Sequence, residues 1–411
     1  MMDKSVYMKW ILILLLLLPG VVRAQQVNEF PDDSEPLHAR VEKYDAVMRG
    51  NHWNEGVMMP HVIFPPAGTE RPMVGNQEDA ADETSQYLSA YAFKYAVTKD
   101  PKDRDIADQL MDGLLKLEKV TGTPGWVARS LNRTDEPIWH EQVFFFPMEW
   151  HESTSMPGYR WEGDLSSDKF VNLCCAMSIY FDLCADEEHK KMAADLIDRF
   201  VGRVVDNNFK MVDVDGKMTL WGNFCPDLPH EKLNSLEILA GLRVAHHLTG
   251  NERYLEACQM LIEKHHYDDE AILAKVLWPE EWKTPWDDHL AAKSLYTLMQ
   301  YETDPSLRQK YRMSLNRHWF DWKTRKFDDA GNLYLVLLYQ ILTKEPVVNE
   351  DVVDGIKHMK GCNRRHETYE ILSMDGLQVI DKKQGEAEGS ATTMILTYWM
   401  GRYWGIIPPE W

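Results

Sequence analysis

The chain has 411 residues, of which 44% are hydrophobic, and its formal net charge is −20. This length and apolar content fit one large core or two small ones. The charge argues against a nucleic-acid-binding surface, because such a surface neutralises phosphates with Lys and Arg. It does not argue against an acidic sugar, since one local group of Arg or Lys outweighs distant charges.

The first 24 residues have the pattern of a secretory signal peptide. Lys4 and Lys9 give a basic start, an apolar run covers 11–18, and residues 22–24 form a small-residue cleavage site. The apolar run is too short to span a bilayer. We therefore expect residues 1–24 to be removed, leaving a periplasmic or secreted protein with no membrane contact after cleavage.

After a predicted N-terminal arm, residues 25–75, the chain repeats one arrangement. An apolar helical stretch runs into a short polar turn, and a second helical stretch follows. The turns cover 98–101, 184–187, 248–251, 302–305 and 343–346. Two of them, Asp100-Pro101 and Asp304-Pro305, place an N-cap residue before a proline that suits the first helical turn.

A helical hairpin cannot bury its apolar face alone, so repeated hairpins must stack. We predict an all-α fold, an (α/α)6 toroid, for a single catalytic domain of residues 76–411 with a funnel at one end. Its predicted helices cover 79–97, 103–120, 166–183, 187–205, 233–248, 252–265, 288–301, 305–318, 332–342, 349–359 and 391–401, with one more at about 35–48 in the arm. We predict mostly loop over 122–159 and a small β-hairpin over 208–220.

Aromatic residues are numerous, with 15 Trp, 17 Tyr and 13 Phe. Several Trp residues fall in predicted loops or at helix ends, including Trp161, Trp221, Trp278, Trp282 and Trp286. Sugar rings stack on such side chains, which supply a large contact area at little entropic cost. The pattern favours a carbohydrate-binding cleft, and ordinary core packing is the alternative.

The sharpest local motif is the segment 161–168, which reads WEGDLSSD. Asp164 and Asp168 are four residues apart, so we expect them to share one face of the first helical turn. A helix start stabilises a carboxylate anion, whereas a neighbouring carboxylate raises one pKa. Such a pair can divide into one proton donor and one anion. The alternative is helix capping by Asp164 with a solvated Asp168.

Two further acidic clusters open predicted helices. One contains Asp79 and Asp82, and the other is Asp287-Asp288-His289. Helix capping explains each of them taken singly. Because all three clusters begin helices of the predicted inner ring, we expect them to face the same funnel. Cleavage of a glycosidic bond commonly uses two carboxylates on either side of that bond.

Other candidates lie in the long predicted loop and near the C-terminus. His140, His151 and Tyr159 are potential substrate-binding groups. Arg160 and Arg364 suit a substrate carboxylate, which guanidinium binds in bidentate fashion, with surface charge as the alternative. The chain has no helical HExxH motif, nucleotide-binding glycine motif or nucleophile elbow. We therefore predict no metal site and no cofactor.

The order of signal peptide, hairpin repeat, the 161–168 motif and the closing segment 398–403 (YWMGRY) resembles the six-hairpin glycosidase superfamily. The chain is similar to secreted bacterial proteins found among polysaccharide-degradation genes. It is distantly similar to unsaturated glucuronyl and rhamnogalacturonyl hydrolases. This resemblance implies inner-helix Asp residues that protonate and hydrate a vinyl ether, and Asp79 and Asp164 match those residues by location.

These observations give a leading hypothesis and two alternatives. The leading one is an exported glycoside hydrolase that acts on uronic-acid-containing oligosaccharides. In it, Asp164 or Asp168 donates the proton, and Asp79 or Asp287 acts as base or stabiliser.

The first alternative is a polysaccharide lyase or oligosaccharide dehydratase, in which His140, His151 or Tyr159 removes the proton next to the carboxylate. The second is a glycan-binding protein without catalytic activity. The sequence leaves the oligomeric state, the sugar and its linkage open.

Overall fold

The computed structural model describes residues 30–64, 73–74, 79–136, 138–140, 149–275, 284–373 and 378–411. The predicted signal peptide lies outside the described residues, as do Trp278 and Trp282. For His140 the structure describes the backbone only.

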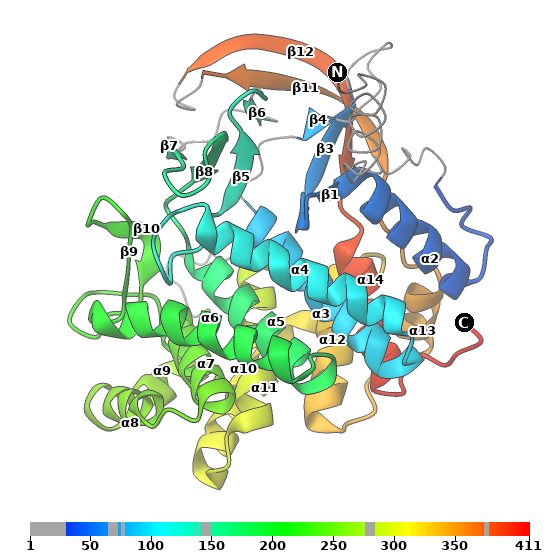
Figure 1. The fold of residues 1–411 in the computed structure, drawn as a ribbon. Coiled ribbons are helices and arrows are strands. Elements are labelled where there is room, and N and C mark those ends of the chain that lie inside the picture. The colour runs from blue at the N-terminus through cyan, green and yellow to red at the C-terminus, as the bar shows by residue number, and fades with distance from the viewer. Residues whose placement is uncertain are drawn as a thin grey trace, which may run out of the picture.

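In the described part of the chain, six helices form a closed inner ring (Figure 1). They are α3 (Ala80–Thr98), α5 (Ser167–Leu183), α7 (Lys232–Thr249), α10 (Pro285–Tyr301), α12 (Ala330–Thr343) and α14 (Thr392–Tyr403). Each helix packs against the next one, and α14 packs against α3, which closes the ring. This closure confirms the predicted (α/α)6 toroid and the six-hairpin architecture that the resemblance implies.

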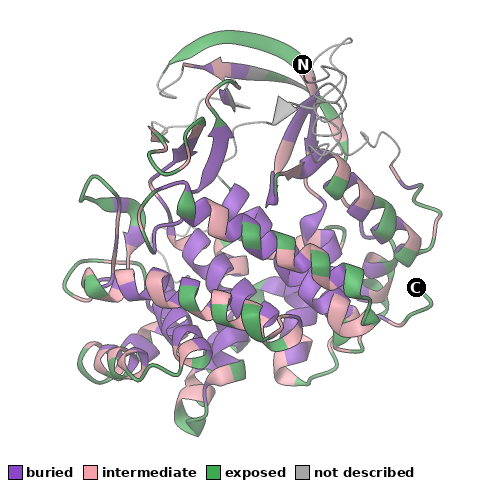
Figure 2. Ribbon diagram, viewed as in Figure 1, coloured by how far each residue is buried: buried purple, intermediate pink, exposed green. Residues whose placement is uncertain are grey.

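An outer layer of helices covers the ring. It consists of α2 (Leu37–Val47), α4 (Pro101–Lys119), α6 (Glu187–Asp206), α8 (Arg253–His265), the short α9 (Tyr267–Ile272), α11 (Pro305–Trp322) and α13 (Glu350–Lys357). In α6 the buried residues Ala193, Leu196, Ile197, Phe200 and Val204 recur at three- and four-residue spacing. Such a stripe is typical of a helix with one face on the core. Figure 2 shows the buried residues concentrated in the inner helices.

The N-terminal arm takes part in this outer layer. Its helix α2 packs against α14, and the π-helical turn η1 (Met48–His52) follows it directly. A buried hydrogen-bond network then joins η1 to the strand β12 (Val379–Gly389). Asn51 Nδ2 donates to Glu388 Oε1 at 2.9 Å, and the His52 ring contacts the same oxygen at 3.2 Å.

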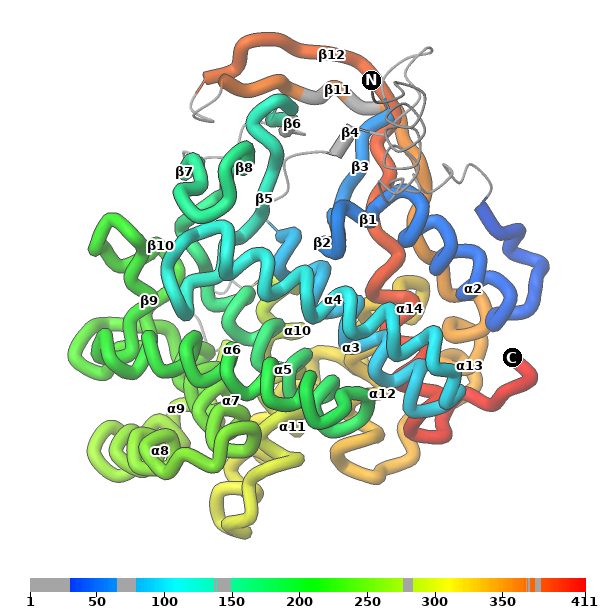
Figure 3. The backbone as a smooth tube through the Cα atoms, viewed as in Figure 1, coloured from blue at the N-terminus to red at the C-terminus, as the bar shows by residue number. Residues whose placement is uncertain are grey.

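Short strands gather at the end of the ring where α3, α5 and α14 begin (Figures 1 and 3). They are β1 (Trp53–Asn54), β2 (Val57–Met58), β3 (His61–Phe64), β4 (Met73–Val74), β5 (Ser130–Arg133), β6 (Ile138–His140), β7 (Trp150–Glu152), β8 (Tyr159–Glu162), β9 (Lys210–Val212), β10 (Met218–Asn223), β11 (Arg364–Leu372) and β12 (Val379–Gly389). The antiparallel sheets have the strand orders β4-β3-β12-β11-β6 and β5-β8-β7, with two-stranded pairs β1-β2 and β9-β10.

The β9-β10 pair confirms the hairpin predicted over 208–220. Most of the described residues of 122–159 are irregular, as predicted, but the segment also contains three short strands that were not predicted, β5, β6 and β7. The long β11-β12 hairpin was not predicted either. Most of β12 is exposed (Figure 2), so it lacks the alternation of apolar and polar residues that reveals a half-buried strand.

The six cysteines are buried free thiols, and such thiols pack as small hydrophobic side chains. No helix among the described residues is long and apolar enough to cross a membrane.

Candidate active site at the mouth of the helical ring

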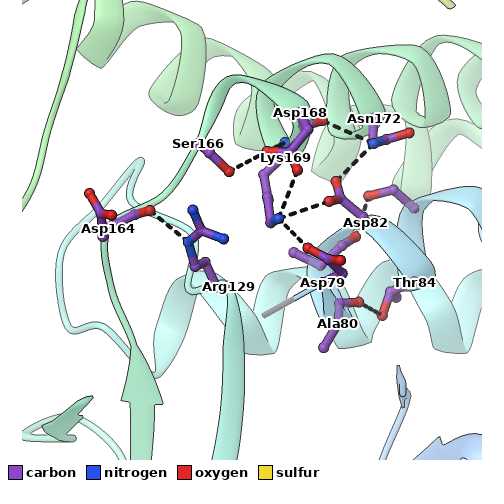
Figure 4. Close-up of polar contacts among 12 residues, drawn as sticks. Asp79, Ala80, Asp82, Thr84, Arg129, Asp164, Ser166, Asp168, Lys169 and Asn172 are labelled. Atoms are coloured by element: carbon purple, nitrogen blue, oxygen red, sulfur yellow. Dashed lines mark hydrogen bonds and ion pairs between the residues drawn. The ribbon is translucent and has the colours of Figure 1, made fainter. Parts of the chain in front are cut away.

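The first turns of α3 and α5 bring three carboxylates around one lysine (Figure 4). The Nζ atom of Lys169 lies 2.5 Å from Asp79 Oδ1, 3.0 Å from Asp82 Oδ2 and 2.9 Å from Asp168 Oδ2. Lys169 and Asp82 are buried, whereas the side chains of Asp79 and Asp168 are 58% and 34% exposed. The two exposed carboxylates are therefore the members that a substrate can reach.

The electrostatics of this cluster divide its carboxyl groups into two kinds. Burial raises the pKa of Asp82 to about 7, against the opposing effect of Lys169 and with the support of Asp168 and Asp79. Burial also acts on Asp168, but Lys169 and Arg129 outweigh it and lower its pKa. The same carboxylates raise the pKa of Lys169 despite its burial. Near neutral pH, Asp168 is therefore an anion while Asp82 is partly protonated.

A polar chain continues from the cluster into the ring. Asn172 Nδ2 donates to Asp82 Oδ1 at 2.9 Å, and the Asn172 side-chain oxygen accepts from Lys293 Nζ. Burial lowers the pKa of Lys293. Asn172 and Lys293 also line a cavity of about 10 Å³ inside the ring, with Ser89, Cys175 and Tyr334 among its other walls. The cluster is thus the outer end of a buried polar network.

Glu237, on α7, is a further acid that the sequence analysis missed. Its side chain is fully buried, and burial raises its pKa to about 8, an effect that the Ser167 hydroxyl opposes and that Asp168 and Asp287 reinforce. A third inner helix therefore presents a neutral carboxyl group to the same end of the ring. The signal was a lone acid in the apolar run Leu236-Glu237-Ile238, which is unusual for a helix of the inner ring.

The structure corrects the predicted pairing of Asp164 with Asp168. Helix α5 begins at Ser167, so Asp164 precedes it in a turn with a left-handed φ of 50°. Its carboxylate accepts from Leu220 N at 2.8 Å, in the β9-β10 hairpin, and its carbonyl accepts from Arg129 Nε at 2.6 Å. In Figure 4 Asp164 lies apart from the cluster around Lys169. The four-residue rule applies only when both residues are helical.

The third predicted acidic cluster begins α10. Asp287 forms a capping box with Thr284, so its carboxylate serves the helix start. The His289 ring stacks on Tyr334, with ring centroids 5.7 Å apart. Its pKa is lowered to about 3, mainly by burial and secondly by the positive charge of Lys293. Trp286 is 77% exposed. The cluster therefore supplies a neutral imidazole and an open aromatic surface.

The remaining residues predicted to bind substrate lie in the strands at the mouth of the helical ring. Trp221, on β10, is 51% exposed, whereas Trp161 is buried with its ring stacked on His151 at 4.5 Å. Tyr159 donates its hydroxyl to Glu55 at 2.7 Å. Trp221 is therefore the member of this group with open ring surface.

Both predicted guanidinium groups are engaged within the protein. Arg160 is buried, donates to the Glu136 carbonyl and lies over the Trp150 ring. Arg364 pairs with the buried Glu388, with Nε 2.8 Å from Oε2. The cation beside the carboxylate cluster is Arg129 instead, which the sequence analysis did not identify (Figure 4).

Comparisons with known proteins concern the fold alone. No protein-family model matches the chain, and no curated protein matches it. Among solved structures, the chain is similar to a GH76 α-mannanase from Bacteroides thetaiotaomicron, at 9% identity and a TM-score of 0.49 over 90% of this chain and 96% of that one.

It is also similar to a sugar epimerase from a ruminal bacterium, at 11% identity and a TM-score of 0.49 over 90% of this chain and 96% of that one. An α-amylase from Clostridium perfringens gives 10% identity and a TM-score of 0.48 over 92% and 99%. The toroid itself rests on the helix packing described above.

Proposed function

We propose that this protein is an exported glycoside hydrolase that cleaves uronic-acid-containing oligosaccharides with the carboxyl groups around Lys169. The observation that supports this most is the division of protonation states within one cluster. Asp168 is anionic and partly exposed, and Asp82, which shares the same lysine, holds its proton to a pH of about 7. Hydrolysis of a glycosidic bond needs one carboxylic acid and one carboxylate.

In this mechanism Asp82 holds the proton, the neighbouring and exposed Asp79 delivers it to the substrate, and Asp168 carries the negative charge. The proton passes to the glycosidic oxygen as the bond to the anomeric carbon breaks. Asp168 stabilises the positive charge that develops on the sugar. Water adds OH to the anomeric carbon, and its other proton restores the acid. Lys169 fixes the spacing of the three carboxylates throughout.

Substrate binding uses the exposed groups at the same end. Trp286 and Trp221 offer open ring faces for sugar stacking. Arg129 is buried and donates to the Asp164 carbonyl, and its positive charge, which lowers the pKa of Asp168, is the one in this region that would attract a substrate carboxylate. A guanidinium group suits that role because its planar donors match a carboxylate. The two arginines favoured by the sequence, Arg160 and Arg364, are not used in this proposal.

A product screen tests this function. The protein without residues 1–24 is incubated with digests of acidic polysaccharides, both saturated and lyase-generated, and products are identified by mass spectrometry with parallel ultraviolet absorbance. We expect release of a terminal sugar with the gain of one water. Asp168→Asn should abolish the product, and Asp182→Asn, near the opposite end of the same helix, should retain it.

Each other outcome contradicts the proposal. Cleavage with new ultraviolet absorbance, or loss of water, assigns a lyase or dehydratase. Binding without any product, retained in Asp168→Asn, assigns a glycan-binding protein.

A further inference from the structure

A second cluster of metal-ligand types lies beside the active-site cluster and plays no part in the mechanism above. Glu149 and His151 come from the start of the β7 segment, and Asp213 directly follows β9. His151 Nε2 lies 2.9 Å from Glu149 Oε1. One ligand atom from each of the three residues lies within 4.8 Å of the other two. Two segments that are distant in the sequence, β7 with the residue before it and the β9-β10 hairpin, thus meet at one point.

The residue at that point is a glycine. A Cβ atom on Gly163 would lie 3.0 Å from Asp213 Oδ2, 3.1 Å from His151 Nε2 and 3.4 Å from the Glu149 carboxyl carbon. The backbone of Gly163 does not have a positive φ, so its conformation does not require glycine. The missing side chain therefore lets the three ligand groups pack closely against the backbone of residue 163, where a Cβ atom would crowd all three. This observation is independent of the distances among the ligands.

The second cluster also differs from the first in what interacts with its carboxylates. There, the Lys169 ammonium group lies among three carboxylates and supplies the cation. Here, the hydrogen bonds to Asp213 come from backbone amides, of Asp164 at 2.7 Å and Val214 at 2.6 Å. Nearby Lys217 pairs with the exposed Asp215 at 2.5 Å. An added cation would therefore balance the negative charge of the two carboxylates at this site.

We propose that Glu149, His151 and Asp213 bind one divalent transition-metal ion, Zn²⁺ or Mn²⁺, among their three ligand atoms. One imidazole nitrogen and two carboxylates suit these ions, whereas Ca²⁺ and Mg²⁺ prefer oxygen ligands alone. Ligand atoms about 2.0–2.2 Å from an ion need only small side-chain rotations from the spacing present here. Three protein ligands leave at least one position for water. The sequence analysis predicted no metal site, and this proposal departs from that prediction.

The ion would stabilise the active-site entrance. Asp213 Oδ2 already accepts from Asp164 N, and the Asp164 carboxylate accepts from Leu220 N at 2.8 Å. The hairpin β9-β10, which carries Trp221, is therefore attached to the segment that leads into α5. A metal held by Asp213 on one side and His151 on the other would lock this attachment. The inference does not depend on the proposed hydrolase activity.

Metal content tests the site directly. The protein without residues 1–24 is stripped with EDTA, incubated separately with ZnCl₂, MnCl₂ or CaCl₂, desalted, and analysed by inductively coupled plasma mass spectrometry. We expect one Zn²⁺ or Mn²⁺ retained per chain and a rise in melting temperature on adding it. Retention of Ca²⁺ but of neither transition metal, or retention of none, would overturn the proposal.

Variants locate the ion. His151→Gln removes a ligand and Gly163→Ala pushes the ligand groups apart, and each should weaken Zn²⁺ affinity at least about tenfold by isothermal titration calorimetry. Asp215→Asn, an exposed acid on the same hairpin, should bind as the wild type does. Circular dichroism verifies folding, and Glu149→Gln replaces any variant that does not fold. Unchanged affinity in the folded ligand variants would place the ion elsewhere and refute the site.

Discussion

The Lys169 ammonium group, on α5, lies 3.0 Å from a carboxylate oxygen of Asp82, on α3, and both side chains are buried. This contact joins the first turns of two neighbouring inner helices at the mouth of the ring. It also fixes how far apart the exposed members of the cluster, Asp79 and Asp168, stand.

Lys169→Met should destabilise the fold. The substitution leaves the Asp168 anion and its acidic neighbours without their cation, and removing one partner of a buried ion pair costs about 3–5 kcal/mol. Chemical denaturation at pH 7 measures the loss. Lys190→Met, which removes an exposed partner of Glu187, should change stability by less than about 1 kcal/mol. Equal effects of the two variants would contradict a buried ion pair at the site.

Asp168→Asn and Asp164→Asn should separate catalysis from positioning. Loss of the Asp168 anion should lower kcat by at least about a hundredfold with the fold intact. Asp164 anchors the Leu220 amide of the β9-β10 hairpin, so its variant should chiefly raise KM. Steady-state kinetics on the substrate found in the product screen measures both. A larger loss of kcat in Asp164→Asn would restore Asp164 as the acid that the sequence suggested.

Glu237→Gln should change how stability depends on pH. Burial raises the folded-state pKa of Glu237 from 4.5 to about 8. The stabilising effect of its bound proton is complete below pH 4.5 and is lost as the pH rises through about 8. Between pH 5 and 8.5 the wild type should therefore lose a few kcal/mol more than Glu237→Gln does.

Urea denaturation at the two pH values measures this difference. Glu187→Gln removes an exposed acid from α6 and controls for the loss of one charge, so it should follow the wild type. Parallel pH dependence in Glu237→Gln and the wild type would show that Glu237 does not bind a proton in the folded protein.

Trp286→Ala should weaken substrate binding without unfolding the protein. The side chain is 77% exposed at the start of α10, so little packing is lost. Loss of one stacking contact should raise KM about 3- to 10-fold with kcat nearly unchanged. Met313→Ala removes an exposed apolar side chain from the outer helix α11 and should leave KM as it is. A KM unaffected by Trp286→Ala would exclude this ring from the substrate site.

Replacing either of two helical glycines with alanine should change the stability of the protein, in opposite directions for the two positions. A Cβ at Gly113, on α4, would lie against the Gly56 backbone carbonyl, so Gly113→Ala should cost about 1–3 kcal/mol. At Gly202, on α6, the Cβ would meet the flexible end of Arg253, which can move away. Gly202→Ala should be neutral or stabilise by up to about 1 kcal/mol through helix propensity. Thermal denaturation distinguishes the two, and a stabilised Gly113→Ala would contradict the close backbone approach.

The helical part of the fold was predictable because its signals are local. Asp100 and Asp304 accept from backbone amides two residues on, at 3.0 and 2.7 Å, as N-caps before proline do. The sheets were not predictable in the same way. Strand β6 pairs with β11, from a distant part of the chain, and neither strand needs a regular apolar face to do so.

Part of the active site followed from topology alone. Helices of the inner ring begin at one end, so Asp79 and Asp168 were expected to meet there, and they do. Lys169 was missed because a lysine beside an aspartate is usually solvated. Its role depends on burial between α3 and α5, which only the assembled ring creates. The metal-ligand cluster was missed for the same reason, since Asp213 reaches His151 through a turn whose direction the sequence does not specify.

Closure of the ring by α14 has a consequence for the order of folding. Helix α14 packs against both α3 and α2, which are made some 300 residues earlier. The apolar side of α3 that α14 covers therefore stays exposed until the C-terminal part of the chain is available for folding. Non-local closure of this kind slows folding and favours partly folded intermediates. A chaperone that shields α3 before the ring closes should therefore increase the yield of folded protein.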